Sequence, residues 1–210
     1  IENFAVSFSN TGFMGIPLVS AVLGDEAVFY VSIYVAFVNV AQQTYGVAVI
    51  TGNWSYVKPK KVLMNPALLA LFIGLTLFFL PVKPPALVMD CVDYIADMNT
   101  ALAMMILGAY LAQTPVRDMF LDAGLYRASA VRLVLVPAVT IAVLAVLPFS
   151  FNIKITELIA AATPVGSNVA VFAQLHGGDY ARATQLVCNS TILSILTLPA
   201  VVWAASMIFY

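Results

Sequence analysis

Seven apolar runs, each about as long as a helix that crosses a bilayer, recur along this 210-residue chain. A soluble domain of this size could not bury so much apolar sequence. The composition agrees, because 62% of the residues are hydrophobic and only 9% are charged. The sequence therefore predicts an all-α, polytopic membrane protein. We place the predicted spans at residues 3–23, 27–50, 62–80, 87–112, 125–147, 155–175 and 185–208.

The first and the sixth of these runs are interrupted near their middles by residues that disfavour a continuous helix. The segments Ser9–Pro17 and Thr163–Val169 each combine glycine, proline, asparagine and hydroxyl residues. Unpaired backbone groups in hydrocarbon are costly, so such breaks persist only where they are buried in protein or line a polar cavity. A matching pair of breaks in two half-sequences is typical of the binding site of a transporter.

The two interrupted spans are separated by an odd repeat of five spans, which predicts an inverted repeat. An odd number of spans makes the second copy enter the membrane from the opposite face. If residues 62–210 form one complete five-helix repeat, residues 1–50 are the last two helices of the other repeat. Residues 51–61 then form a cytoplasmic linker. On this interpretation three further helices precede the chain, and the intact protein has ten.

The basic residues outside the spans favour one orientation of the chain in the membrane. Cytoplasmic connections carry an excess of Lys and Arg, and the predicted topology puts six basic residues on one side and two on the other. The six are Lys58, Lys60, Lys61, Arg117, Arg127 and Arg182, and the two are Lys83 and Lys154. The richer side is assigned to the cytoplasm, which makes the C-terminus external, in a bacterial inner membrane or a plasma membrane.

Several classes of function find no support in the sequence. One His and two scattered Cys do not supply a zinc site, and there is no Gly-x-x-x-x-Gly-Lys-Ser/Thr phosphate loop. No nucleophile and base are paired at membrane depth, and no basic stripe indicates nucleic acid. We therefore predict no enzyme activity, no cofactor, no bound metal and no nucleic-acid partner.

The interrupted segments supply the candidate substrate-binding residues. A helix that begins inside the membrane presents unpaired N–H groups and the positive end of its dipole, which together bind anions without a charged side chain. Alternatively, the polar side chains only satisfy the backbone groups freed by the break. The candidates are Asn10, Thr11, Gly12, Gly166, Ser167 and Asn168, with Pro17 and Pro164 as helix-breaking residues. Asn39, Gln42 and Gln43 either line the translocation path or bond to other helices.

Charged residues inside the predicted spans are candidates for charge balance or ion coupling, because an ionisable group at that depth is costly to bury. Arg132 either balances an anionic substrate or extends to the cytoplasmic headgroups. Asp90, Asp93 and Asp97 share one helical face, and Asp97 is the better candidate for a coupled carboxylate. Glu157 is expected at the start of a helix, where its charge favours the dipole.

Several short motifs, by their order and spacing, resemble the auxin efflux carrier family, which includes plant PIN proteins and bacterial malate-permease-like members. The resemblance covers essentially the whole chain and aligns it with helices four to ten of that family. The motifs are Ser9–Leu18 with Gly24, Asn65–Leu68, Leu107–Leu111, Thr163–Ala173, Gly177–Asp179, and Ser190–Ser194 with Leu198 and Pro199.

The resemblance implies a ten-helix, inverted-repeat carrier of small organic anions whose broken helices four and nine cross at the substrate site. It places Asn10 and Asn168 against a substrate carboxylate, and it implies an elevator-like movement of one helix bundle against another. It leaves open whether transport is coupled to protons, to sodium or to neither, and whether the protein is a homodimer. We therefore predict a secondary-active transporter of small organic carboxylates in the lipid bilayer.

Two alternatives belong to other classes. A sodium-dependent bile-acid-type symporter has a related inverted repeat but requires a cage of carboxylates and carbonyls around the crossing, and no acidic residue lies close to Asn168. A seven-helix receptor is less favoured, because such receptors usually place their C-terminus inside the cell.

Overall fold

The computed structural model of this chain describes residues 1–56, 60, 64, 66–80, 84–113 and 116–209. Regular structure in these residues is helical, apart from one isolated antiparallel bridge between Ser9 and Val165. The predicted linker, 51–61, lies partly outside the described residues. The first half contains α1 (Glu2–Ser7), η1 (Thr11–Gly15), α2 (Ile16–Leu23), η2 (Asp25–Ala27), α3 (Val28–Ala41), η3 (Gln42–Gly46), α4 (Val47–Thr51), η4 (Trp54–Tyr56) and α6 (Pro66–Phe79). The second half contains α7 (Ala86–Ala112), α8 (Val116–Leu121), α9 (Ala123–Ala130), η5 (Val131–Leu135), α10 (Val136–Val146), α11 (Phe151–Ala162), α12 (Asn168–Leu175) and α13 (Tyr180–Phe209).

Three helical runs within the described residues are long and apolar enough to cross a membrane, judged by length and composition. They are Asp25–Thr51, Ala123–Val146 and Tyr180–Phe209. Many large apolar side chains on these runs point away from the protein; Phe37 is 73% exposed and Leu196 is 78% exposed. An apolar exterior of this extent is stable against lipid and not against water, which agrees with an all-α membrane protein.

The helix breaks predicted within spans 3–23 and 155–175 are both present in the structure. α1 ends at Ser7 because Phe8 is extended, with φ −117° and ψ 122°. α11 ends at Ala162, and the next residue, Thr163, is extended with φ −61° and ψ 151°. Thr163 precedes Pro164, whose ring disfavours helical backbone in the preceding residue.

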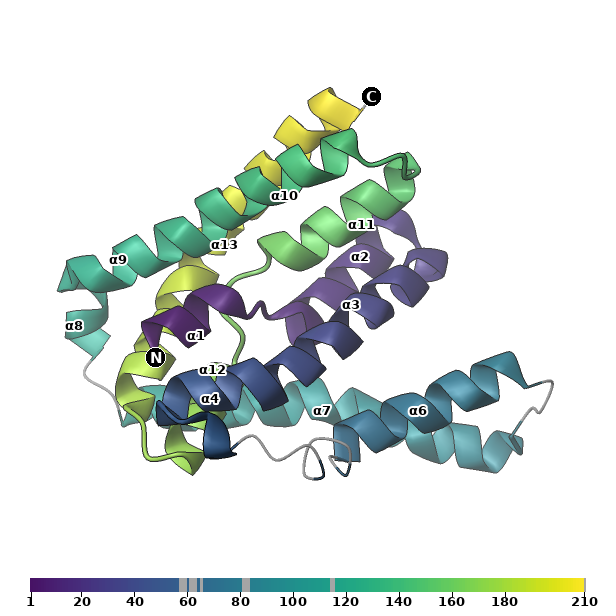
Figure 1. The fold of residues 1–210 in the computed structure, drawn as a ribbon, viewed down its shortest axis with the longest axis horizontal. Coiled ribbons are helices and arrows are strands. Elements are labelled where there is room, and N and C mark those ends of the chain that lie inside the picture. Colours follow the sequence, from purple (N-terminus) through teal and green to yellow (C-terminus); the bar gives the residue numbers. More distant parts are fainter. Residues whose placement is uncertain (57–59, 61–63, 65, 81–83, 114–115, 210) are drawn as a thin grey trace.

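The two extended segments pair with each other, so the interrupted helices cross near the middle of the molecule (Figure 1). The Asn10 amide donates to the Pro164 carbonyl over 2.8 Å, and the Gly166 amide donates to the Phe8 carbonyl over 3.0 Å. These two bonds form the bridge between Ser9 and Val165. Each break therefore supplies the backbone partners that the other has lost.

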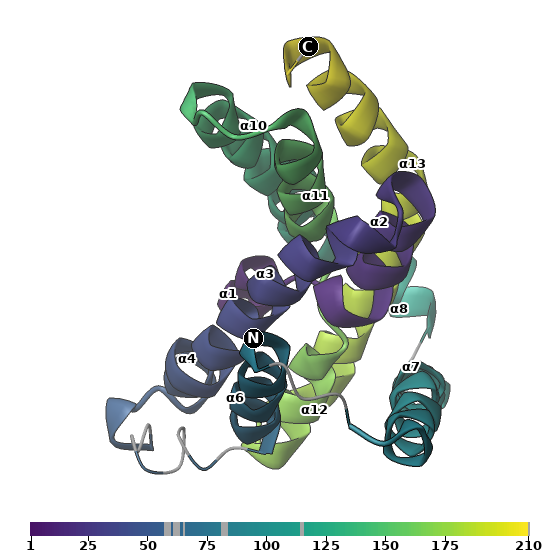
Figure 2. The same cartoon turned by 90° about the vertical axis from the view of Figure 1, so that its right-hand side faces the viewer.

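Two apolar clusters hold the crossing from either side. One joins α1 to α12 through Phe4, Phe8 and Val169, and the other joins α2 to α11 through Val19 and Ile159. The first half of one broken helix thus packs with the second half of the other. α13 packs against both α11 and α12, whereas α6 packs against α3 and α7 against α13, on different flanks of the molecule (Figure 2).

Candidate functional site

Four helix ends meet at the crossing. α1 and α11 both end there, so their last carbonyl groups and the negative ends of their dipoles point into it. The helical turn η1, which continues into α2, and the helix α12 both begin there and present their first N–H groups. The crossing therefore has one set of unpaired acceptors and one set of unpaired donors, and each needs a partner.

Arg132 satisfies the acceptors. Its Nε donates to the Thr163 carbonyl over 3.1 Å, Nη1 donates to the Val6 carbonyl over 3.2 Å, and Nη2 donates to the Ala161 carbonyl. One guanidinium thus caps the C-terminal ends of α1 and α11, where a cation is favoured by both dipoles. The side chain is 1% exposed, so it does not extend to the membrane surface, as one of the two sequence interpretations held.

Hydroxyl groups fill the interior of the crossing. The Thr11 hydroxyl donates to the Ala160 carbonyl over 2.9 Å and lies 2.7 Å from the hydroxyl of Ser9. The Thr163 hydroxyl also donates to the Ala160 carbonyl. On the α13 side, the Val165 amide donates to the Ser190 hydroxyl over 3.1 Å. The alternative interpretation, in which these side chains satisfy freed backbone groups, therefore holds for Thr11.

A cavity of about 360 Å³ opens where the two helices begin. Several N–H groups on its wall donate to no partner within the described part of the chain. They are those of Thr11, Gly12 and Phe13 on η1, of Ser167 just before α12, and of Asn168 at its start. Both dipoles direct their positive ends into this space. The lining residues are Ser9, Asn10, Thr11, Gly12, Phe13, Ile16, Val35, Val38, Asn39, Gln42, Gly166, Ser167 and Asn168.

Amide side chains from three segments complete the wall of this cavity. Asn10 Nδ2 lies 3.4 Å from the Ser167 hydroxyl, and Asn168 Nδ2 donates to Gln42 Oε1 over 3.2 Å. Each amide nitrogen carries two hydrogens, so Asn168 and Gln42 retain free donors. No Lys, Arg, Asp or Glu is among the described residues that line the cavity. Its chemistry is that of a neutral, donor-rich anion site.

All six candidate binding residues line this cavity. Of the two predicted helix-breaking prolines, one lies in a break and the other does not. Pro164 lies in the break before α12, whereas Pro17 lies in the first turn of α2, beyond the break. Of the second-span residues, Asn39 and Gln42 reach the cavity wall and Gln43 does not. Gln42 also bonds to Asn168, which is the interhelical bond that was the second interpretation of this residue.

Among the charged candidates that the structure describes, Arg132 and Glu157 line one cavity and the acidic residues of α7 do not. Asp90 and Asp93 are exposed on α7, and the side chain of Asp97 lies outside the described part of the structure. Glu157 was expected at a helix start, but α11 begins at Phe151, so Glu157 lies in the middle of that helix. It lines a second cavity, of about 520 Å³, together with Arg132 and Tyr34.

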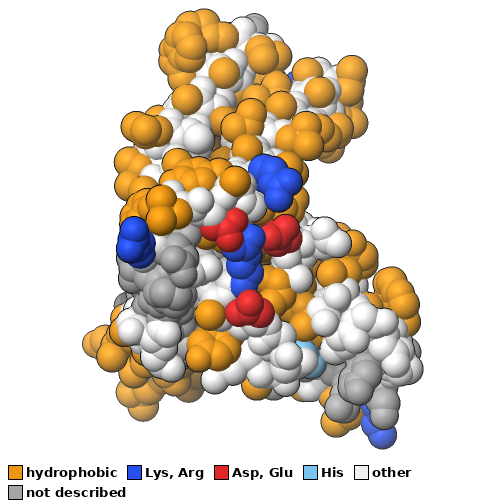
Figure 3. Space-filling model, turned by 90° about the vertical axis from the view of Figure 1, so that its left-hand side faces the viewer, with side chains coloured by type: hydrophobic (Ala, Val, Ile, Leu, Met, Phe, Trp, Pro, Cys, Tyr) orange, Lys and Arg blue, Asp and Glu red, His pale blue; other side chains and the backbone are white. Residues whose placement is uncertain are grey.

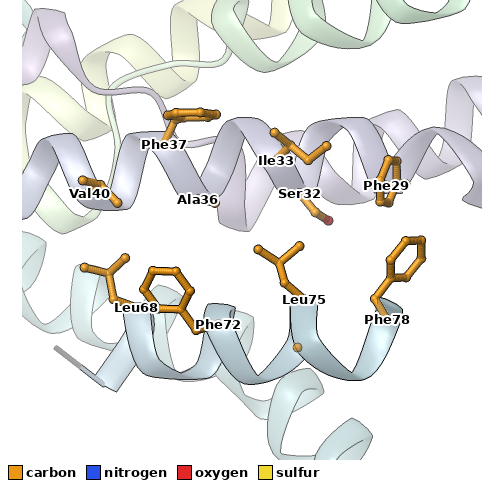
Figure 4. A pocket seen from close by; sticks show the side chains of 11 residues that line it. Phe29, Ser32, Ile33, Ala36, Phe37, Val40, Leu68, Phe72, Leu75 and Phe78 are labelled. Carbon is orange, nitrogen blue, oxygen red and sulfur yellow. The ribbon is translucent and has the colours of Figure 1, made fainter. Parts of the chain in front are cut away.

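A third hollow, of about 420 Å³, lies between α3 and α6 and is apolar (Figure 4). Phe29 and Val40 of α3 line it from one side, and Leu68, Phe72 and Phe78 of α6 line it from the other. Ser32 supplies the one polar side chain among its lining residues. Such a surface has nothing to hold a carboxylate.

Charged side chains gather on one face of an otherwise apolar surface (Figure 3). Arg182 bonds to Glu2 Oε1 over 2.7 Å and to Asp122 Oδ2, and its backbone amide donates to Asp179. This Arg182 cluster ties α1, α9 and α13 together. The guanidinium of Arg182, and then the Gly124 amide, lower the pKa of Asp122 from its ordinary value of 3.8.

Sequence reasoning missed three polar residues around the crossing. Ser190 holds the backbone of the second break, Asn189 bonds to the Ser129 hydroxyl over 2.7 Å, and the Tyr34 hydroxyl lies 3.3 Å from Ser9. A signal for Asn189 and Ser190 exists, since adjacent polar residues in an apolar helix commonly bond to other helices. Tyr34 has no such signal, because tyrosine is common throughout membrane helices.

Comparison with known proteins agrees with this architecture. A model of the family described as membrane transport protein matches residues 3–60 and 53–202. A protein of Rhizobium meliloti (strain 1021) named "Putative malonate transporter" is 27% identical over 213 residues, which cover 97% of this chain and 66% of the relative. An "Uncharacterized transporter" of Methanothermobacter thermautotrophicus is 27% identical over 198 residues, which cover 93% of this chain and 64% of the relative.

The chain thus spans slightly less than two thirds of the length of these relatives. The family match nevertheless extends over nearly all of its residues, including both interrupted segments. The resemblance drawn from the motifs is confirmed: the chain belongs to the membrane transport protein family, that of the auxin efflux carriers.

Proposed function

We propose that this chain forms the substrate-binding part of a secondary-active carrier for small organic carboxylates. The observation that carries the proposal is the cavity at the crossing, where two helix starts present free N–H groups and no lining residue carries a charge. A carboxylate entering it would accept these hydrogens and find two positive dipole ends. The family and the named relatives are transporters, so an enzyme is not proposed.

Within this site, Asn168, Gln42 and Asn10 are proposed to hold the carboxylate. Asn168 and Gln42 fix each other's orientation, which leaves their remaining N–H groups directed at the cavity. Gly12 and Gly166 let the ligand approach the backbone closely, and Phe13 and Val38 supply apolar walls. The cavity suits an acid with a short carbon skeleton, and the name of the Rhizobium relative makes malonate the first compound to test.

The proposed mechanism is alternating access of the elevator type, in which one helix bundle carries the crossing past another. The proposed architecture is a ten-helix inverted repeat with seven spans in this chain. In this architecture, residues 1–50 form the last two helices of the first repeat. Residues 62–210 form the complete second repeat. The pairing of α1 with α12 and of α2 with α11 supports this proposal, because an inverted repeat exchanges these partners.

Uptake by the full-length parent protein in proteoliposomes tests the function. Malonate, malate and indole acids would be compared, with and without a pH gradient and with and without sodium. We expect a small dicarboxylate to be taken up. Uptake that requires sodium would favour the bile-acid-type alternative, although no group of three or more metal-ligating side chains occurs in the described residues.

Asn168→Ala tests the site. We expect substrate affinity to fall by about 10- to 100-fold, the effect of losing one hydrogen bond to a charged group. Asn152→Ala is the matched control, because Asn152 is exposed at the start of α11. Binding would be measured by titration calorimetry on protein that elutes as a single species. Unchanged affinity in Asn168→Ala would remove this residue from the site.

A further inference from the structure

The cavity behind the crossing contains a carboxyl group that the anion site does not use. Glu157 lies on α11 four residues before Ala161, so both face the same side of the helix. Arg132 lines the same cavity and bonds to the carbonyl of Ala161. A carboxyl group and the guanidinium that holds both helix ends therefore line one cavity.

Within the part of the chain that the structure describes, the Glu157 carboxylate has no hydrogen-bond donor and no ion-pair partner. Its side chain is half-buried among Val, Ile and Ala residues of α10 and α11. An ionised carboxylate without a partner is costly in such surroundings.

Few other titratable groups face this position. η5 contributes Arg132 and α3 contributes Tyr34, while α2 and α10 carry none. The part of α13 that packs on α11, around Val201 and Ala205, carries none. Asp25 and Glu26 of η2 are exposed, and Lys154 lies over the ring of Phe209, with Nζ 5.4 Å from its centre.

We propose that Glu157 is a proton-binding site that takes up a proton when an organic anion occupies the cavity at the crossing. The inference rests on the proposed function and assigns its coupling ion. With Glu157 ionised, its negative charge lies beside the crossing without a partner and opposes the entry of an anion. With Glu157 protonated, the anion and the guanidinium balance each other across the crossing. In a medium of low dielectric this difference is large.

Coupling of this kind is reciprocal: the anion raises the affinity of Glu157 for a proton, and the proton raises the affinity for the anion. One coupled proton makes anion affinity fall by up to about tenfold for each pH unit above the range in which the free site is protonated. The carrier then works as a proton–anion symporter, and the neutral pair crosses with the moving bundle. A sodium ion is a poorer occupant, because it needs several oxygen ligands and this cavity offers one carboxylate.

The test measures malonate affinity of the full-length parent in sodium-free detergent solution at several pH values between 5.5 and 8.5. We expect the wild-type affinity to fall as pH rises, and Glu157→Gln to bind at the wild type's low-pH level throughout. Glu26→Gln, an exposed glutamate, is the matched control and should keep the wild-type slope. Comparing the variants cancels the titration of malonate itself.

A second measurement needs no substrate. Dicyclohexylcarbodiimide attacks protonated carboxyl groups in apolar surroundings, so it should modify Glu157 at pH 6, less at pH 9, and spare Glu26. Peptide mass spectrometry locates the adduct. A wild-type slope retained in Glu157→Gln, or a Glu157 that escapes modification at pH 6, would overturn the proton site. Absence of carboxylate binding by the wild type at every pH would instead overturn the proposed function and the coupling with it.

Discussion

At the scale of single residues, the crossing depends on a few groups with no redundancy. Arg132 alone caps two helix ends, and its three carbonyl partners would be buried without donors if it were removed. This explains why a charge is retained at this depth without any contact to the proposed anion. Gly166 is a second residue on which the crossing depends, because two backbone segments approach each other there.

Gly166→Ala should destabilise the fold. A Cβ at this position would lie 3.1 Å from the Ser9 carbonyl oxygen and 3.5 Å from that of Phe8, both of which are backbone atoms fixed by the bridge. Overpacking of this kind costs about 1–3 kcal/mol. We expect the unfolding temperature of the full-length protein in detergent to drop by several degrees. In the control, Gly74→Ala on α6, the new Cβ meets nothing within 4 Å, and equal losses in both variants would contradict the argument.

At the scale of elements, widened helical turns contain several residues of the crossing and of the cavity beside it. The π-helical turns η1, η3 and η5 contain Thr11 and Gly12, Gln42, and Arg132 respectively. Two of them are followed at once by a helix with proline in its first turn, Pro17 in α2 and Pro137 in α10. Proline lacks the N–H that a regular turn would donate, so a widened turn before it is a natural adjustment.

The Arg182 cluster makes the docking of α1, α9 and α13 sensitive to acid. Because the pKa of Asp122 is lowered in the folded protein, its stabilising effect is present above pH 3.8, the ordinary value, and is lost as pH falls further through the lowered pKa. We expect Asp122→Asn to lower the unfolding temperature at pH 7, and its difference from the wild type to shrink as pH falls below 3.8. The same difference at both pH values would show that the charge of Asp122 does not matter.

At the scale of the whole molecule, the starts of α9 and α13 lie at one end of the fold and the C-terminus at the other (Figure 1). The N-terminus, the start of α9 and the start of α13 meet at one end through the Arg182 cluster. The connection between α10 and α11 lies at the other end, near the C-terminus (Figure 1). Two of the connections predicted to share the cytoplasmic side, those before α9 and before α13, are therefore neighbours in space. We retain the external C-terminus as a proposal.

Cysteine accessibility tests this orientation in cells. In full-length protein with Cys91 and Cys188 replaced by serine, Phe149→Cys should react with a membrane-impermeant maleimide added outside. His176→Cys should react only after the membrane is permeabilised. Both positions are exposed, so reactivity reports the side of the membrane and not burial. The reverse pattern would invert the proposed topology.

The sequence by itself determined the membrane class, the two breaks and the family, because hydrophobic run length and the helix-breaking effect of glycine and proline act locally. It also identified the six residues of the proposed site, since these lie within the breaks. It did not determine which polar groups stay free. That Thr11 turns its hydroxyl to Ala160, that Gln42 pairs with Asn168, and that Glu157 lies in the cavity of Arg132 are contacts between segments far apart in the chain. Only the tertiary structure decided them, because a hydrogen bond depends on where its partner is placed and no local pattern specifies that.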